Sequence, residues 1–224
     1  MLFVAEKEAE EDEKYVFHDP VLAFSCLQGF HGLKKDAVLT DVTLVVQGEE
    51  FHCHRALLAA NSYYFNAMLC GNFVETNSNK IELSEMNSAT FRLVLDYLYC
   101  GDVEIDGDNV QNLFDAAHML QLENLEAACV RYMRGNITDK NCLDVYFFAI
   151  NFEKSGLKEA AEKKISSRFS KITKAAEFLH LPADKACKIL ELCNILLCTE
   201  EDVYAAALRW LEFDIETRKE SMCR

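Results

Sequence analysis

Four reactive side chains stand next to one another early in the chain: His52, Cys53, His54 and Arg55. Imidazole and thiolate groups bind zinc, and a thiol activated by an imidazole is a common nucleophile. The residues before them alternate between apolar and polar types, which predicts a strand whose successive side chains point to opposite faces. Cys53 would then face away from both histidines. The chain also has no CxxC or HxxxH spacing, so we expect no metal site.

Motifs for catalysis are also missing from the sequence. It contains no phosphate-binding GxxxxGK, no nucleophile elbow and no paired catalytic carboxylates. A cysteine on the inward face of a half-buried strand is more often part of a core than a nucleophile. The sequence therefore predicts a protein that is not an enzyme and needs no cofactor.

Composition restricts the partners. The formal net charge is −14, and no cluster of Lys and Arg offers a site for phosphates, so nucleic acids and anionic membranes are not expected partners. No apolar run approaches the ~20 residues that span a bilayer. The ten cysteines lie mostly within apolar helical patterns, and an acidic run follows "MLFVA" where a signal peptide would be apolar. We expect a reduced intracellular protein, cytoplasmic with the nucleus as a second compartment.

The chain divides into three parts. Residues 1–18 are predicted to be an acidic disordered tail, residues 19–135 a mixed α+β domain and residues 136–224 an all-α domain packed directly against it. Asp19 and Pro20 predict the start of a helix that is apolar on nearly every side. One face of that helix can cover its own domain, and a partner chain is the natural cover for the other.

Within residues 19–135, alternation predicts two strands joined by a turn at Gln47–Gly48, a third strand in "NKIELS" and a short edge strand in "DVEI". Helices are predicted from "SYYFNAML" and from three later segments, 89–100, 109–122 and 124–135. After Gly135 only helices follow, and Thr138 or Asp139 could cap the first of them. Their predicted ranges are 138–152, 157–169, 175–181, 183–193 and 200–213.

Longer stretches resemble known families. The segments "LTDVTLVVQGEEFHCHRALLAANSYYFNAML", "IELSEMNSATFRLVLDYLYCGDVEI" and "NVQNLFDAAHMLQLENLEAACVRYM" are similar to a BTB (POZ) domain. The segments "NCLDVYFFAINF", "LKEAAEKKISSRF" and "EEDVYAAALRWLEFDIETRK" resemble a BACK domain. The order of the two is typical of kelch-like proteins, and the resemblance covers roughly residues 21–222. It implies a small sheet flanked by helices, followed by a helical BACK domain that ends partway, without a kelch propeller.

The resemblance implies that the His-Cys-His run belongs to the fold, with His54 and Arg55 at the start of the next helix. It also implies dimerisation through the BTB domain, with itself or with a related BTB protein. Asp41 and Arg55 match a charged pair at the BTB dimer pocket. The implied interface residues are Leu22, Phe24, Leu27, Phe30, Asp41 and Arg55.

Many proteins of this kind are substrate adaptors of cullin-3 ubiquitin ligases. Their motif is an apolar residue, any residue and then Glu in one loop, and Phe73 and Glu75 match it in "CGNFVETN". Asn66 on the preceding helix is a further candidate contact. Phe147 and Asn151 stand where the family adds a second groove for the cullin.

Two alternatives stay open from the sequence. The chain could be a BTB scaffold outside the ubiquitin pathway, recruiting transcriptional corepressors or organising the cytoskeleton. A chain that ends at "RKESMCR" without a substrate reader could also pair with a full-length relative and reduce its activity.

Overall fold

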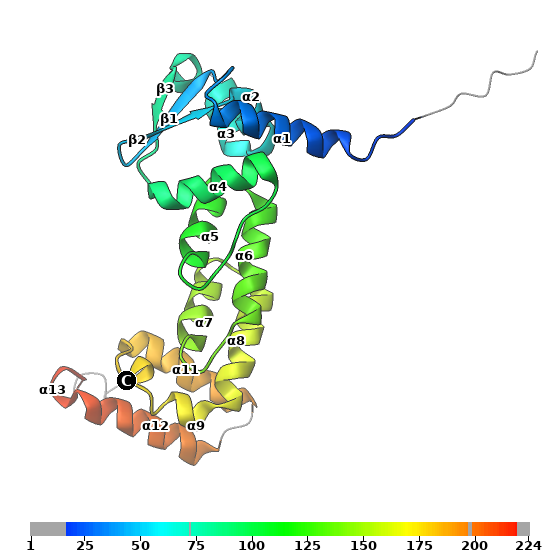
Figure 1. Cartoon of the computed structure of the whole chain (residues 1–224). Helices are drawn as coiled ribbons and strands as arrows, with labels where there is room; N and C mark the ends of the chain where they lie inside the picture. Colours follow the sequence, from blue (N-terminus) through cyan, green and yellow to red (C-terminus); the bar gives the residue numbers. More distant parts are fainter. Residues whose placement is uncertain (1–16, 72, 197–198, 219–224) are drawn as a thin grey trace, which may run out of the picture.

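The structure is a computed structural model that describes residues 17–71, 73–196 and 199–218, without the side chains of 193–196. The molecule is elongated (Figure 1): the sheet and α1–α4 lie at one end, α9–α13 lie at the other, and α5–α8 connect them. In the first domain the elements are α1 (Leu22–Lys35), β1 (Val42–Val46), β2 (Glu49–Cys53), α2 (Arg55–Asn61), α3 (Tyr63–Cys70), the 3-10 helix η1 (Val74–Asn77), β3 (Lys80–Glu82), α4 (Ser88–Cys100), α5 (Val110–Met119) and α6 (Glu123–Gly135).

The second domain is helical throughout its described residues. Its elements are α7 (Cys142–Asn151), α8 (Ser155–Ser167), α9 (Phe169–Ile172), α10 (Ala176–Leu179), α11 (Ala183–Leu196), α12 (Glu200–Phe213) and α13 (Ile215–Arg218). The predicted fold class, a small sheet among helices followed by a helical region, is confirmed.

The sheet has the strand order β2-β1-β3, with β1 antiparallel to β2 and parallel to β3. Gln47 and Gly48 both have positive φ (50° and 82°), as a tight hairpin turn between β1 and β2 requires. The predicted alternation holds, because Val42, Leu44 and Val46 are buried on one face of β1. The end of β2 leads directly into the start of α2.

Several helix ends follow from local hydrogen bonds. Ser62 caps α3 by accepting the Phe65 amide at 3.1 Å, and Asn87 caps α4 by accepting the Thr90 amide at 2.7 Å. Gly101, with φ of 79°, ends α4 in the left-handed conformation. These caps fix both ends of the α3–α4 segment that carries the candidate site.

Three local predictions were wrong. "DVEI" forms no strand: Val103 and Ile105 pack against the core, so the alternation reflects one buried face and no pairing. Helix α7 begins at Cys142, since Thr138 forms a turn with the Asn141 side chain (2.7 Å) instead of capping the helix. Helix α1 begins at Leu22, and the Asp19 carboxylate accepts the Val21 amide one turn earlier, at 3.0 Å.

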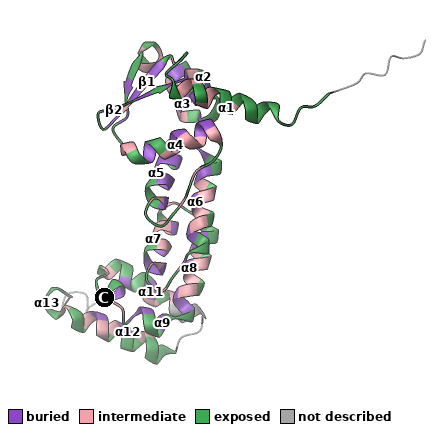
Figure 2. Cartoon of the chain, in the orientation of Figure 1, coloured by how far each residue is buried: buried purple, intermediate pink, exposed green. Residues whose placement is uncertain are grey.

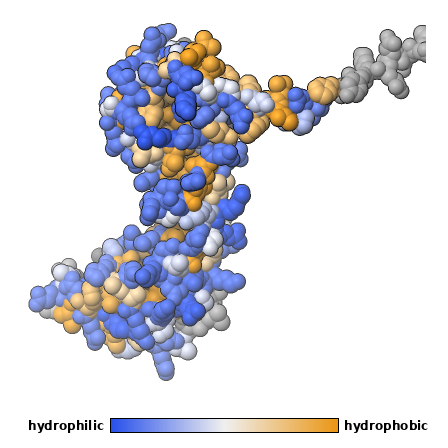
Figure 3. Space-filling view, in the orientation of Figure 1, coloured by the Kyte–Doolittle hydropathy of each residue, from blue (hydrophilic) through white to orange (hydrophobic). Residues whose placement is uncertain are grey.

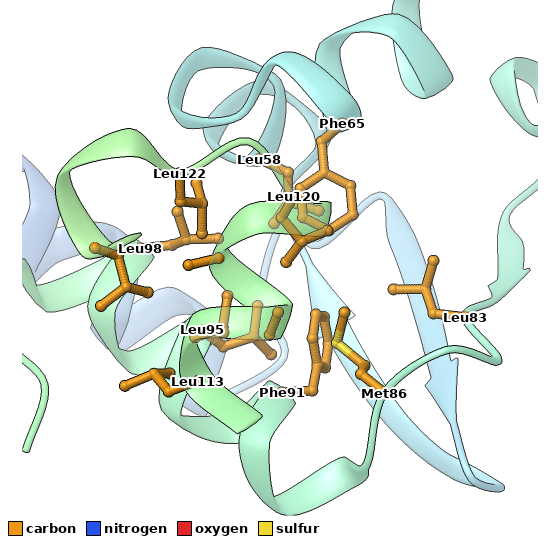
Figure 4. Packing of buried hydrophobic residues seen from close by; sticks show 14 of the residues in the cluster. Leu58, Phe65, Leu83, Met86, Phe91, Leu95, Leu98, Leu113, Leu120 and Leu122 are labelled. Carbon is orange, nitrogen blue, oxygen red and sulfur yellow. The ribbon is translucent and has the colours of Figure 1, made fainter. Parts of the chain in front are cut away.

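The core is continuous across the boundary between the domains. In Figure 4, Leu95 of α4 lies near Leu113 of α5, and Phe91 of α4 lies beside Met86, all inside the first domain. Phe114 of α5 then contacts Phe148 of α7 edge-on, with ring centres 4.7 Å apart. The direct packing predicted for the two domains is therefore confirmed.

A second cluster fills the far end of the molecule. It contains Tyr146, Phe178, Ile189 and Trp210, and the indole of Trp210 donates to the Leu181 carbonyl at 2.9 Å. Among the helices of the described residues, none is long and apolar enough to cross a membrane.

Candidate functional site

The reactive-looking run at 52–54 serves packing. Cys53 is buried, and burial raises the pKa of its thiol to about 12. His52 lies on the opposite, exposed face, with Nδ1 3.1 Å from the Thr43 hydroxyl. Within the described ranges, no group of three His, Cys, Asp or Glu side chains is arranged to hold a metal ion.

His54 joins α4 to the segment that follows α1. Its Nδ1 lies 2.9 Å from the Tyr99 hydroxyl, and its Nε2 lies 3.3 Å from the Val38 carbonyl. A carbonyl only accepts, so these partners assign the proton to Nε2 and leave Nδ1 to accept from Tyr99. The Phe30 ring of α1 packs edge-on against the imidazole, 5.2 Å between centres. The buried histidine is thus a structural link to α1.

The loop after α3 presents two apolar side chains to solvent. Phe73, just before the short helical turn η1, is 59% exposed, and Val74, its first residue, is 87% exposed. Glu75 is half-buried in that turn, and among the described residues no hydrogen bond reaches its carboxylate. The shape of the loop is held instead by Thr76, whose hydroxyl lies 2.7 Å from the Gly71 carbonyl.

Helix α3 extends this surface with a single exposed stripe. Tyr63, Asn66, Ala67 and Cys70 recur at helical spacing on its outer side. Asn66 donates to the Ala59 carbonyl at 3.3 Å, which orients its amide beside the stripe. The sequence analysis did not single out Tyr63, which is 74% exposed, although its spacing of three residues from Asn66 places it on the same face.

A groove lies beside the stripe. It is bounded by α1, the α2–α3 corner, the end of α4 and the α5–α6 corner, and its lining includes Leu27, Tyr63, Asn66, Tyr97, Gln121 and Asn124. Tyr63 and Asn66 thus belong both to the stripe and to the groove wall. The loop, the stripe and the groove form one surface on the first domain.

Asp41 and Arg55 are neighbours, but not as the side-chain ion pair that the resemblance implied. The Asp41 carboxylate accepts the backbone N–H of Arg55 at 2.7 Å, at the start of α2. The Arg55 guanidinium donates through Nε to the Asp41 carbonyl (3.3 Å) and through its two Nη atoms to the carbonyls of Thr76 (3.0 Å) and Ser78, in the loop after Phe73. It is therefore drawn toward the exposed loop.

Of the two candidates on α7, only Asn151 is at the surface. Phe147 is buried in the second cluster, with the Lys185 ammonium over its ring, 4.9 Å from the centre. The groove on this helix lies on another face, where Val145 and Phe148 meet Val110 and Met133 and Asp144 forms part of the rim. Phe147 therefore lies on a face of α7 that packs inward.

Helix α1 is exposed over much of its length, which Figure 2 shows as a mostly green helix projecting from the domain. Leu22 is 65% exposed and Phe24 is 51% exposed, and Figure 3 shows orange surface along the projecting helix. Leu27 and Phe30 instead pack partly against the core. The helix thus covers its own domain with one face and leaves a second apolar face open.

Comparison with known proteins agrees with this arrangement. Two family models match, the BTB/POZ domain over residues 30–137 and "BTB And C-terminal Kelch" over residues 142–224. The BTB domain of zebrafish PATZ1 aligns with a TM-score of 0.50 at 26% identity, covering 55% of this chain and all of that one. The BTB domain of human gigaxonin aligns equally well at 28% identity, covering 55% of this chain and 99% of that one.

Curated relatives match over most of this chain. Kelch repeat and BTB domain-containing protein 8 of Xenopus tropicalis is 36% identical over 90% of this chain and 33% of its own length. Kelch-like protein 23 of Pongo abelii is 33% identical over 96% of this chain and 38% of its own length. This chain thus spans about a third of the length of the curated relatives it matches.

The fold and its exposed surfaces define a protein-interaction chain built from two domains that are not catalytic. The chain belongs to the BTB–BACK proteins, related to the kelch-like and the kelch-repeat-and-BTB proteins.

Proposed function

We propose that this chain is a dimeric adaptor that binds cullin-3 and links it to a substrate for ubiquitination. The observation that carries the proposal is the exposure of Phe73 and Val74 on a loop joined to the outer stripe of α3. Single aromatic side chains at the centre of an interface supply much of the binding energy when a partner covers them. The likeness to kelch-like proteins supplies the identity of the partner.

The cullin-binding surface would combine three features of the first domain. Phe73 would enter a pocket of the cullin, Glu75 would lie at the edge of the contact, and Asn66 with Tyr63 would face the cullin from the groove wall. The groove on α7 lined by Val145 and Phe148 would accept a flexible apolar segment of the cullin, in place of the contact first assigned to Phe147. Asn151 would lie outside that groove, at the end of the helix.

Dimerisation would use the open face of α1. Leu22 and Phe24 supply exposed apolar area, and stable homodimer interfaces are more apolar than ordinary surface. Leu27 and Phe30 would support the helix from beneath, by packing on their own domain. A related BTB protein with a similar helix could replace the second copy.

The test compares the affinity of the N-terminal domain of cullin-3 for three proteins by calorimetry. The wild-type chain is expected to bind with Kd at or below about 1 μM, and the double variant Phe73→Ala, Glu75→Lys is expected to bind at least roughly thirtyfold more weakly. The control, Tyr204→Ala with Glu201→Lys on α12, likewise removes one exposed aromatic ring and reverses one charge, at sites far along the chain. Equal affinity of all three proteins would contradict the assigned surface.

A further inference from the structure

The loop that presents Phe73 has no apolar anchor of its own. Phe73 and Val74, its two apolar residues, are both exposed, so hydrophobic packing does not fix its shape. Such a segment would sample many conformations unless polar contacts restrain it. The restraints must therefore be sought in hydrogen bonds.

Arg55 supplies a side-chain restraint from outside the loop, in addition to the bond from the Thr43 amide of β1 to the Asn79 carbonyl (2.8 Å). Its guanidinium reaches from the first turn of α2 and donates through Nη1 to the Thr76 carbonyl (3.0 Å) and through Nη2 to the Ser78 carbonyl. The planar guanidinium holds both donors in a fixed relation, so two carbonyls of the loop are set by one side chain. Arg55 is half-buried, which keeps water from competing fully for these bonds.

Two further features fix the loop where it leaves α3. The Thr76 hydroxyl lies 2.7 Å from the Gly71 carbonyl and 3.2 Å from that of Met68, so it closes the loop back onto the end of the helix. A Cβ at Gly71 would lie 2.3 Å from the Ala67 carbonyl oxygen and 3.0 Å from the Phe73 ring. Only glycine lets the aromatic ring lie this close to the backbone.

We infer that Arg55 is a positioning residue that preorganises the Phe73 loop for cullin-3. The inference rests on the proposed function for the identity of the partner. A side chain held in place before binding loses less conformational freedom on association, so affinity rises without a new contact. Within the loop, Arg55 bonds the carbonyls of Thr76 and Ser78, so its effect on binding passes through the conformation of the loop.

The first test needs no partner. Two loop amides are protected by bonds within the loop, Thr76 to the Phe73 carbonyl at 3.2 Å and Ser78 to the Glu75 carbonyl at 3.1 Å. Arg55→Ala is expected to speed hydrogen exchange at residues 73–78 by at least roughly tenfold, whereas the control Arg92→Ala on α4, whose partner is Glu49, leaves it unchanged. Unchanged exchange in Arg55→Ala would overturn the inference.

The second test is a double-mutant cycle on the affinity for the N-terminal domain of cullin-3. Arg55→Ala alone is expected to weaken binding roughly tenfold, and to change it less than about twofold when Phe73 is already Ala. Two independent losses that multiply would mean that Arg55 does not act through Phe73. Failure of the wild-type chain to bind would instead overturn the proposed function, while the exchange result would still decide the dependence of the loop on Arg55.

Two milder variants guard against loss of folding. Arg55→Lys keeps the charge but lacks the fork that reaches both carbonyls, and Thr76→Val keeps the shape but removes the hydroxyl. Both are expected to weaken binding, as Arg55→Ala does, and to keep melting temperatures near that of the wild type. Intact binding in both variants would overturn the inference. A monomeric Arg55→Lys variant that binds normally would also overturn it and would assign Arg55 to the dimer interface.

Discussion

The Tyr99 hydroxyl bonds two groups of His54. It accepts the backbone amide of His54 at 2.9 Å, and it lies 2.9 Å from Nδ1 of the His54 ring. Both groups are buried, so Tyr99→Phe would leave a buried N–H and a ring nitrogen without partners. We expect it to lower the free energy of unfolding by about 1–3 kcal/mol.

Chemical denaturation of the two proteins measures this difference. Tyr97→Phe, on the same helix, is the control: its ring is half-buried and no hydrogen bond to its hydroxyl occurs among the described residues. Equal losses in the two variants would show that the His54 network contributes nothing specific.

The cysteines divide into two groups by burial. Burial raises the pKa of Cys53 to about 12 and those of Cys129 and Cys142 to about 11, so their reactive thiolates are scarce at pH 8. Cys26, Cys70 and Cys187 are exposed, and Cys100 is half-buried and belongs to neither group.

We expect an alkylating reagent at pH 8 to label the exposed group within minutes and the buried group only after unfolding. Peptide mass spectrometry over a time course checks the order. Because the folded pKa values are raised, the stability tied to these thiols is present below about pH 9 and is lost as the pH rises toward 11. Fast labelling of Cys53 in the folded protein would contradict this account.

One carboxylate of α6 adds an ion pair to the packing that joins the two domains. Glu126 bonds His118 at 3.1 Å and pairs with Lys154, which lies just before α8. Burial alone would raise the pKa of Glu126, but the hydrogen bonds from Lys154 and His118 lower it on balance. A lowered folded pKa means stability that is present above the ordinary value of 4.5 and lost as the pH falls through the folded value.

Glu126→Gln is therefore expected to lower the melting temperature at pH 7 and to make little difference well below pH 4.5. Thermal scans of both proteins across that pH range measure the gap, which is the difference between their melting temperatures at each pH. A gap that stays constant with pH would show that the charge on Glu126 does not stabilise the junction.

The open apolar face of helix α1 leads to a prediction about the oligomeric state. Phe24→Glu puts a charge on its open apolar face, so we expect a monomer in light scattering, near 25.5 kDa, with little loss of protomer stability because Phe24 is 51% exposed. Gln28→Glu is the control, since it adds a charge at an exposed polar position of the same helix. A Phe24→Glu variant that stays dimeric would move the interface away from this face.

Periodicity was enough to predict most of the elements, because buried faces leave a regular pattern in the sequence. It could not separate a strand from an extended segment with one buried face, as at Val103 and Ile105, since pairing depends on a neighbour elsewhere in the chain. It also could not show which face of α7 packs inward: Phe147 is buried, whereas its neighbour Phe148 lines the groove. Likewise, the direction of the Arg55 guanidinium depends on carbonyls more than twenty residues away.

At the level of the whole molecule, the continuous core joins the two domains into one elongated unit. Phe114, Phe148 and Phe152 join them, with ring centres less than 5 Å apart. A cullin bound at the Phe73 loop would therefore have a set orientation relative to α9–α13 at the far end (Figure 1). This is what an adaptor needs to present a substrate at a defined place.

The most direct test of the adaptor role is the mass of the complex with the N-terminal domain of cullin-3, measured by light scattering over a titration. The account expects saturation at one cullin per protomer on a dimer of this chain, with Kd at or below about 1 μM. A chain that stays free of cullin at roughly tenfold higher concentrations would contradict the account and would leave a BTB–BACK scaffold with other partners.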